Sequence, residues 1–195
     1  MMFFRPLPTT IGIVAILLCS SPTTIAATIA KVDPAHTSAT FSVRHLTLTT
    51  VSGTIALKNV DIAIGDDDIL TQANATFDLS TIDTHESDRD SDLKSDHWFD
   101  VAHYPEMTFK STKIDAGTGG AMAIAGDLTF HGITKPVTLA GKYEGSVKDG
   151  RGRTHLGYSA SGTVDRTAWN LGPNFPPAVV GDDITITIEL EAIES

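Results

Sequence analysis

Hydrophobic and polar positions alternate with period two along most of the chain beyond residue 28, the pattern of half-buried β-strands. The last run is the clearest, with isoleucine or leucine at every second position from 184 to 190 and threonine or glutamate between them. Positions 122–130 form another such run, and residues 131–136 connect it to a return strand at 137–143. About eight or nine strands fit this spacing. No intervening segment provides a βαβ crossover, so we expect an antiparallel sheet.

A sheet of this size is stabilised against aggregation when it closes on itself, because closure removes exposed strand edges. We therefore predict an all-β antiparallel barrel of about eight strands. The apolar parity switches near Lys58–Asn59, which predicts a β-bulge at that point. Small residues on apolar faces favour spare room inside the barrel, or else mark strand bends: Ala73, Ala75, Gly126, Ala160 and Gly162.

One stretch, Thr84–Pro105, breaks the alternation. Ser87 or Asp88 is a suitable helix N-cap, acidic residues crowd the first turn, and Pro105 prevents continuation of a helix. The apolar anchors of the stretch are Leu93, Trp98, Phe99 and Val101. We expect one helical loop at an end of the barrel. It either forms a lid over an interior cavity or plugs the barrel end with its anchors.

The first 27 residues predict a secretory signal peptide, which is removed from a mature domain of residues 28–195. Arg5 precedes a short apolar run, and the small residues at Ala26–Ala27 suit cleavage. Cys19 follows a leucine, whereas a lipoprotein signal requires a small residue there. We therefore expect cleavage to remove Cys19 rather than lipidation of its thiol.

The composition narrows the classes of partner. The formal net charge of the chain is −10, and loss of the leader removes Arg5 but no acidic residue, which leaves −11. A domain this acidic repels phosphate backbones and anionic lipid surfaces, so we expect no nucleic-acid partner and no stable membrane insertion. Cys19 is the only cysteine, so the mature domain has no disulfide and no thiolate metal site.

No sequence motif for catalysis is present: there is no nucleophile elbow, phosphate-binding loop, dinucleotide fingerprint or metalloprotease helix. His85, His97 and His103 share the Thr84–Pro105 stretch with five aspartates, but their spacing fits no tight metal-binding motif. We therefore expect no enzymatic activity, no catalytic residue, no metal and no cofactor. Apolar strand faces with an aromatic lid favour a pocket for a long hydrocarbon chain instead.

Several different short motifs follow one another along the mature chain. They are Asp33–Ser38 with Phe41 and Val43–His45; Ser87–Asp90 with Leu93–Ser95; Trp98–Val101 with Tyr104–Pro105 and Thr108–Thr112; Gly126–Val137; and Asp165–Arg166 with Gly181–Asp182. Together they resemble the YceI family, lipocalin-like periplasmic proteins associated with polyisoprenoid binding. The proline-rich Asp165–Gly181 loop departs from the plain form of that region, which leaves head-group selectivity open. For Asp88–Asp90 and His131–Gly132 we favour structural roles, in capping and fixing the helical loop and in making a tight turn.

The resemblance implies a lipocalin-like barrel whose tunnel holds an isoprenoid quinone, a polyprenol or another long-chain amphiphilic lipid. It implies a soluble periplasmic carrier with this lipid as its partner, and a homodimer is compatible with it. Strand parity selects the candidate lining residues Phe41, Val43, Phe77, Phe99, Phe109, Leu128, Phe130, Tyr158, Trp169 and Ile186. Two alternatives stay open: a metal- or haem-associated accessory protein that uses His85, His97 and His103, and a barrel enzyme that acts on a lipid.

Overall fold

The computed structural model describes residues 28–65 and 67–194, so the predicted signal peptide and Cys19 lie outside the described residues. The strands are β1 (Thr28–Ile29), β2 (Lys31–Val32), β3 (Ser38–His45), β4 (Thr49–Ile64), β5 (Leu70–Asp83), β6 (Glu106–Ala116), β7 (Ala121–Phe130), β8 (Ile133–Lys148), β9 (Thr154–Asp165) and β10 (Val180–Ile193). The helical elements are α1 (Ser87–Lys94) and two 3₁₀ turns, η1 (Pro34–His36) and η2 (Arg166–Trp169). In the described part of the chain, no helix is long and apolar enough to cross a membrane.

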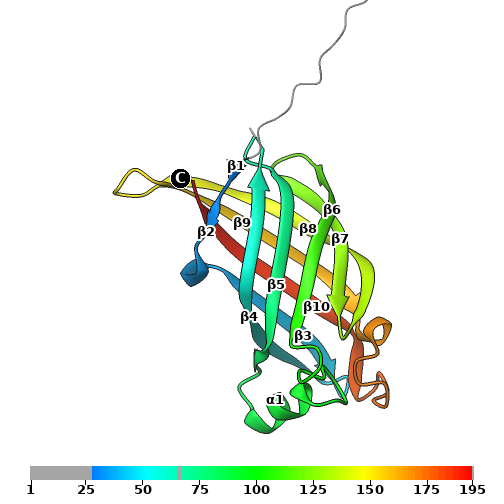
Figure 1. The fold of residues 1–195 in the computed structure, drawn as a ribbon. Helices are drawn as coiled ribbons and strands as arrows, with labels where there is room; N and C mark the ends of the chain where they lie inside the picture. The colour runs from blue at the N-terminus through cyan, green and yellow to red at the C-terminus, as the bar shows by residue number, and fades with distance from the viewer. Residues whose placement is uncertain (1–27, 66, 195) are drawn as a thin grey trace, which may run out of the picture.

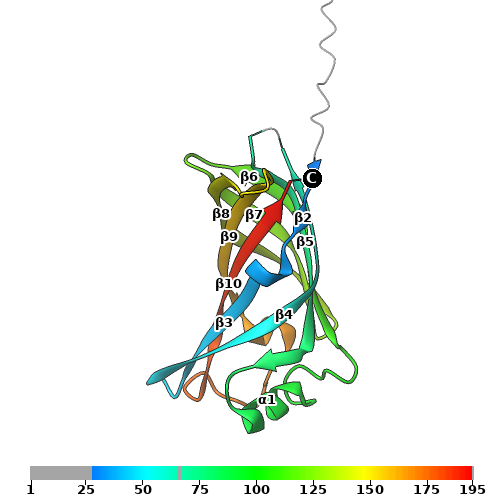
Figure 2. The same cartoon turned by 90° about the vertical axis from the view of Figure 1, so that its left-hand side faces the viewer.

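Eight of the strands form a closed antiparallel ring (Figure 1, Figure 2). Their order is β4-β3-β10-β9-β8-β7-β6-β5, and the pairing of β4 with β5 closes the ring. The two short N-terminal strands lie outside this path, β1 paired with β4 and β2 with β10. Because the ring is closed, none of the eight strands is left as a free edge. The predicted antiparallel barrel with one helical loop is confirmed.

Strand register tests two local predictions. The β4–β5 pairing shifts between Leu57 and Asn59, which confirms the predicted bulge. The β7–β8 connection is shorter than expected, because the return strand begins at Ile133 and the turn is His131–Gly132 alone, not residues 131–136. Both turn residues have positive φ, 49° and 70°, as a two-residue hairpin of type I′ requires.

The connections at the two ends of the barrel differ in length. One end, the lid end, carries the β3–β4 and β7–β8 hairpins, the lid segment (84–105) and the mouth loop (170–179). The opposite end, the base, carries the turns that follow β4, β6 and β8. Helix α1 lies across the lid end in both views. Both long connections therefore cover the barrel interior from the same side.

The space beside two glycines of the inner wall is filled by the side chains of larger neighbours. A Cβ added to Gly126 would lie 2.5 Å from the Phe109 ring, and one added to Gly162 would lie 2.6 Å from the Leu139 side chain. The prediction of spare room at these two positions is therefore wrong, because bulkier side chains lie across them. The other three of these small residues, Ala73, Ala75 and Ala160, do border an interior cavity.

Candidate functional site

Three overlapping cavities run along the barrel interior. The upper cavity, beneath the lid segment, has about 780 Å³ of atom-free space including its open side, the middle one about 390 Å³ and the lower one about 560 Å³. The middle cavity shares Phe77 and Leu128 with the upper cavity, and Ala75 and Phe109 with the lower cavity. The three cavities therefore adjoin one another along the barrel interior, and this row of cavities is called the tunnel below. The enclosed volume of the upper cavity is only about 90 Å³, so the tunnel is narrow.

The tunnel wall is almost entirely hydrocarbon. Polar residues on it are Thr40 and Arg166 around the upper cavity and Asn74, Tyr158 and Ser159 around the lower one, while the middle cavity has none. A narrow, apolar slot suits a slim hydrocarbon chain, since such a ligand is held by removal of its methylene groups from water.

Nine of the ten predicted lining residues border this tunnel. Phe41, Phe77, Phe99, Leu128, Phe130, Trp169 and Ile186 border the upper cavity, Phe109 the middle and lower cavities, and Tyr158 the lower cavity. Val43 borders none of the three, because it lies closer to the lid end than Phe41, the last β3 residue on the upper cavity. Parity selects the inward face of a strand but not how far a cavity extends along it. Ligand binding by these residues stays a prediction.

Several further lining residues were not predicted as binding residues, among them Trp98, Met107 and Leu171 of the upper cavity. Met107 has the same parity as Phe109 on β6, so its position was available from the alternation. Trp98 was identified only as an anchor of the lid segment. Leu171 belongs to the mouth loop, where no period exists, and no sequence signal marks it as inward-facing.

Helix α1 begins one residue earlier than predicted. Its N-cap is Glu86 and not Ser87 or Asp88, because the Glu86 carboxylate accepts hydrogen bonds from the N–H groups of Asp88 at 3.3 Å and Arg89 at 2.7 Å. These bonds satisfy two of the N–H groups that the first turn leaves without a partner. None of the helix residues is fully buried, and the one apolar side chain of α1, that of Leu93, is partly buried against the core and borders the upper cavity.

A polar network fixes the start of the lid segment. The N–H and hydroxyl groups of the buried Thr84 both donate to Asp90 Oδ1, at 2.9 and 2.5 Å. The Arg89 guanidinium donates to the Thr84 hydroxyl and carbonyl oxygens at 2.8 and 2.9 Å. The hydrogen bonds from Thr84 lower the pKa of Asp90 and keep its carboxyl charged. The predicted structural role of this acidic motif is thus confirmed for Arg89 and Asp90.

Aromatic pairs join the lid segment to the barrel and to the mouth loop. Trp98 stacks on Phe175 with ring centroids 4.9 Å apart, and Phe99 meets Phe130 edge to face at 4.9 Å. Gly172 approaches so closely that an added Cβ would lie 2.4 Å from the Trp98 ring. Because a cavity lies beneath these residues, the segment covers the barrel interior as a lid and does not fill it.

Arg166 is the central tie of the mouth loop and is only 2% exposed. Its guanidinium donates to five backbone carbonyl oxygens, those of Leu171, Gly172, Phe175, Val180 and Gly181, at 2.6–3.1 Å. A guanidinium has five N–H donors, so none is left for a ligand head group. Asp182 Oδ1 lies 2.9 Å from Nη2 and balances the buried charge, without hydrogen-bond geometry. The Arg166 side chain therefore holds the loop and does not recognise cargo.

At the base, two tyrosines hold the β4–β5 turn. The Tyr158 hydroxyl donates to the Asp68 carbonyl oxygen at 2.8 Å, and the Tyr143 hydroxyl donates to Asp68 Oδ2 at 2.7 Å. Burial raises the pKa of both tyrosines, so both remain neutral donors. The hydrogen bonds that hold this turn therefore come from neutral hydroxyls, whereas the mouth loop at the lid end is held by the buried Arg166 cation.

The lid histidines do not gather into a site. Each lies beside one aspartate close to it in sequence: His85 with Asp83 at 3.4 Å, His97 with Asp96 at 3.7 Å and His103 with Asp100 at 2.8 Å. Among the residues that the structure describes, the one group of three metal-ligating atoms is Asp33, His36 and Glu191, on another part of the barrel. The structure thus offers the metal or haem alternative no assembled site at the lid.

Comparison with known proteins identifies the family. The model of the YceI-like domain matches residues 31–192. The chain belongs to the YceI family. Protein YceI of Escherichia coli O157:H7 is 32% identical over 157 residues, which cover 79% of this chain and 81% of that protein. A UPF0312 protein of Vibrio parahaemolyticus is 31% identical over 157 residues, 80% of each chain.

Solved structures agree with the barrel assignment. The crystal structure of a Campylobacter jejuni YceI protein has a TM-score of 0.68 and 26% identity, covering 78% of this chain and 90% of that one. A polyisoprenoid binding domain from Saccharophagus degradans, implicated in plant cell wall breakdown, has a TM-score of 0.61 over 86% of this chain and 98% of that one. At 13% identity, the second likeness shows the shared YceI-type fold alone.

Proposed function

We propose that this YceI-family chain is an exported carrier that binds the hydrocarbon chain of a polyisoprenoid, or of a similar long-chain amphiphile, and catalyses no reaction. The observation that carries the proposal is the row of adjoining, carbon-lined cavities beneath the lid segment. Burial of ten methylene groups contributes about 8 kcal/mol before the costs of ordering and association. The description of the S. degradans neighbour as a polyisoprenoid binding domain supports the same ligand class.

The proposed ligand is recognised by its chain and not by a charged head group. Arg166 is the one cationic side chain on the tunnel wall, and its five N–H groups all bond to backbone oxygens. The Tyr158 hydroxyl, at the other end, donates its hydrogen bond to the Asp68 carbonyl oxygen. Neither group is free to pair with a phosphate or carboxylate, so a head group is best placed outside the tunnel at the lid end.

We also propose that the mature protein acts in the periplasm as a soluble, monomeric or dimeric carrier. The proposal rests on the leader, whose short apolar run follows Arg5 and precedes small residues at Ala26–Ala27. Cell fractionation with N-terminal sequencing tests it. A periplasmic product beginning near residue 28 is expected, and a full-length cytoplasmic product would contradict it.

Native mass spectrometry tests the carrier function directly. The tag-free mature protein, purified from the periplasm, should show a discrete mass adduct that organic solvent extracts as a long-chain lipid. A mass without adduct, unchanged after incubation with isoprenoid quinones, polyprenols and fatty amides, would overturn the proposal. Turnover of the bound lipid by the pure protein would favour a barrel enzyme instead.

A substitution that narrows the tunnel separates binding from folding. Ala75→Phe places a ring where the middle and lower cavities join, and we expect roughly a tenfold or greater loss of polyprenol affinity. Ala123→Phe is the matched control, since Ala123 is exposed on β7. Equal affinity in the two folded variants would place the ligand elsewhere. Phe109→Asp and Phe130→Asp, which add a charge to the wall, should also abolish binding.

A further inference from the structure

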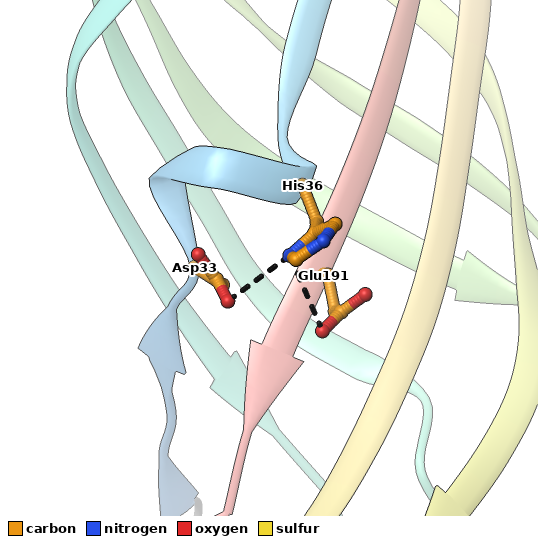
Figure 3. Close-up of side chains that lie close together, drawn as sticks. All are labelled: Asp33, His36 and Glu191. Atoms are coloured by element: carbon orange, nitrogen blue, oxygen red, sulfur yellow. Dashed lines mark hydrogen bonds and ion pairs between the residues drawn. The ribbon is translucent and has the colours of Figure 1, made fainter.

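A cluster of ligand-type side chains lies on the outer wall of the barrel, apart from the tunnel (Figure 3). Asp33, His36 and Glu191 bring one potential ligand atom each to within 4.8 Å of one another. Asp33 precedes η1, His36 ends η1, and Glu191 lies on β10. The neighbour of Glu191 in sequence, Leu190, lines the lower cavity, so Glu191 points to the opposite face of the sheet.

The spacing of the three atoms approaches that of a metal coordination shell. His36 Nδ1 lies 3.2 Å from Asp33 Oδ2 and 4.0 Å from Glu191 Oε1. Nitrogen and oxygen ligands about 2.0–2.1 Å from a tetrahedral zinc ion lie roughly 3.3 Å from each other. The first pair already meets this spacing, and the other two pairs, which lie within 4.8 Å, would shorten on metal binding.

The backbone presents these side chains in a fixed arrangement. Asp33 caps η1 with one carboxylate oxygen, since Oδ1 accepts the N–H of Ala35 at 2.9 Å, and its Oδ2 faces His36. The Asp33 N–H donates to the Glu191 carbonyl oxygen at 2.8 Å, which holds the two ligand-bearing segments side by side. The carboxylates are 23% and 29% exposed and the imidazole 65% exposed, so an ion can reach all three.

A second layer of side chains orients Glu191. His155 Nδ1 lies 2.7 Å from Glu191 Oε1, and its Nε2 lies 3.2 Å from Asp149 Oδ2. Asp149 is itself paired with Arg153 at 2.7 Å. Outer partners of this kind fix the direction of a ligating carboxylate and strengthen metal binding. His155 is therefore a positioning residue in this cluster.

We propose that Asp33, His36 and Glu191 form a binding site for a zinc-type divalent ion. One imidazole with two carboxylates suits Zn²⁺ better than Mg²⁺ or Ca²⁺, which prefer shells of oxygen atoms alone. A bound ion would join η1 to β10 and so fasten the N-terminal segment to the barrel wall. The site is independent of the tunnel, because the sheet separates the two.

The lid segment contains a natural comparison for this site. Asp100 and His103 have the same three-residue separation as Asp33 and His36, and their side chains are 2.8 Å apart. Among the described residues, however, the group of three potential ligand atoms is the Asp33, His36 and Glu191 cluster, and the Asp100–His103 pair belongs to no such group. If an aspartate–histidine pair were enough to bind zinc, both pairs would do so; if the third ligand is required, only the pair beside Glu191 should.

Zinc titration of the tag-free mature protein by isothermal calorimetry tests the proposal. We expect one Zn²⁺ per chain and a rise in thermal unfolding temperature on binding. Glu191→Gln or His36→Ala should lower the affinity by roughly 100-fold and His155→Gln by roughly 10–100-fold. His103→Ala should leave it unchanged, and Mg²⁺ should not compete.

Two results would overturn the zinc site. The first is an affinity that Glu191→Gln and His36→Ala leave within about twofold of the wild-type value, in variants whose unfolding temperatures without metal match the wild type. The second is no heat of binding at Zn²⁺ concentrations up to about 100 µM, which corresponds to a binding free energy weaker than about −5.5 kcal/mol. Neither result would affect the lipid-carrier proposal, since the tunnel contains none of these residues.

Discussion

The two ends of the barrel are closed by different means. At the lid end, the lid segment and the mouth loop meet through aromatic rings, and one buried cation, Arg166, ties the loop backbone together. At the base, short turns between neighbouring strands suffice, and the ties are the neutral hydroxyls of Tyr143 and Tyr158 on Asp68. The base is closed by short turns that hydroxyl groups of distant strands hold in place, whereas the lid end is closed by two long connections that aromatic contacts and the buried Arg166 hold in place.

The difference indicates where the tunnel would exchange cargo. Opening the base requires strands of the closed ring to separate, which breaks many ladder hydrogen bonds at once. Opening the lid end requires the lid segment to separate from the barrel and the mouth loop, where the Trp98 and Phe99 ring contacts and the hydrogen bond from the Gly172 N–H to the His97 carbonyl oxygen hold it, while β-strand pairing is kept. The lid end is therefore the expected site of ligand entry, and the following changes test how far the two ends differ.

The largest effect is expected from Arg166→Met. The substitution leaves five backbone carbonyl oxygens without their donor and Asp182 without its cation, so the free energy of unfolding should fall by about 3–5 kcal/mol. Urea denaturation measures this change. Arg151→Met, at an exposed arginine of the base, is the control and should change stability by less than about 0.5 kcal/mol. Equal effects of the two variants would show that Arg166 is not the tie of the lid end.

Gly172→Ala tests the aromatic contact at the lid end. Gly172 has a φ of 57°, which favours glycine, and an added Cβ would collide with the Trp98 ring. We expect a loss of about 1–3 kcal/mol in stability and a change in tryptophan fluorescence. The matched change at the base, Gly150→Ala, meets nothing within 4 Å and should be nearly neutral. A neutral result at Gly172 would mean that the mouth loop moves freely from Trp98.

Tyr158→Phe tests the neutral tie at the base. It removes the hydrogen bond to the Asp68 carbonyl oxygen but keeps the ring, so the loss of stability should be about 1 kcal/mol by urea denaturation. Tyr104→Phe, at the partly exposed tyrosine of the lid end, serves as the control and should be neutral. A loss as large as that of Arg166→Met would contradict the idea that the base is held mainly by its strands.

The smallest effect concerns pH. Hydrogen bonds from Thr84 hold the pKa of Asp90 below its usual 3.8, so the charged carboxylate contributes stability above that value. The contribution disappears as the pH falls through the lowered pKa of the folded protein. The stability difference between the wild type and Asp90→Asn should therefore be present at about pH 6 and shrink toward zero at about pH 2. A difference that does not vary with pH would rule out this role for the carboxylate.

Much of the fold was predictable from local pattern. The period-two alternation identified the strands, its parity switch located the bulge at Leu57–Asn59, and the broken alternation marked the lid segment. Strand parity accounts for seven of the nine predicted residues that border the tunnel, because each inward position of a barrel strand faces the shared interior, whereas Phe99 lies in the lid segment and Trp169 in η2. The helix boundary was less certain from sequence, and the cap is Glu86, since any of several polar residues can satisfy the first turn.

Only the tertiary structure decided which distant groups meet. Arg166 and the mouth loop backbone are brought together by the path of an aperiodic segment, which no alternation describes. His36 and Glu191 lie at opposite ends of the mature sequence and meet because β2 pairs with β10. The sequence by itself determined the strands, their inward faces and the family. Ring closure determined the reach of the tunnel, the tie at its mouth and the cluster on its outer wall, because strand periodicity is local while contacts across a closed sheet are not.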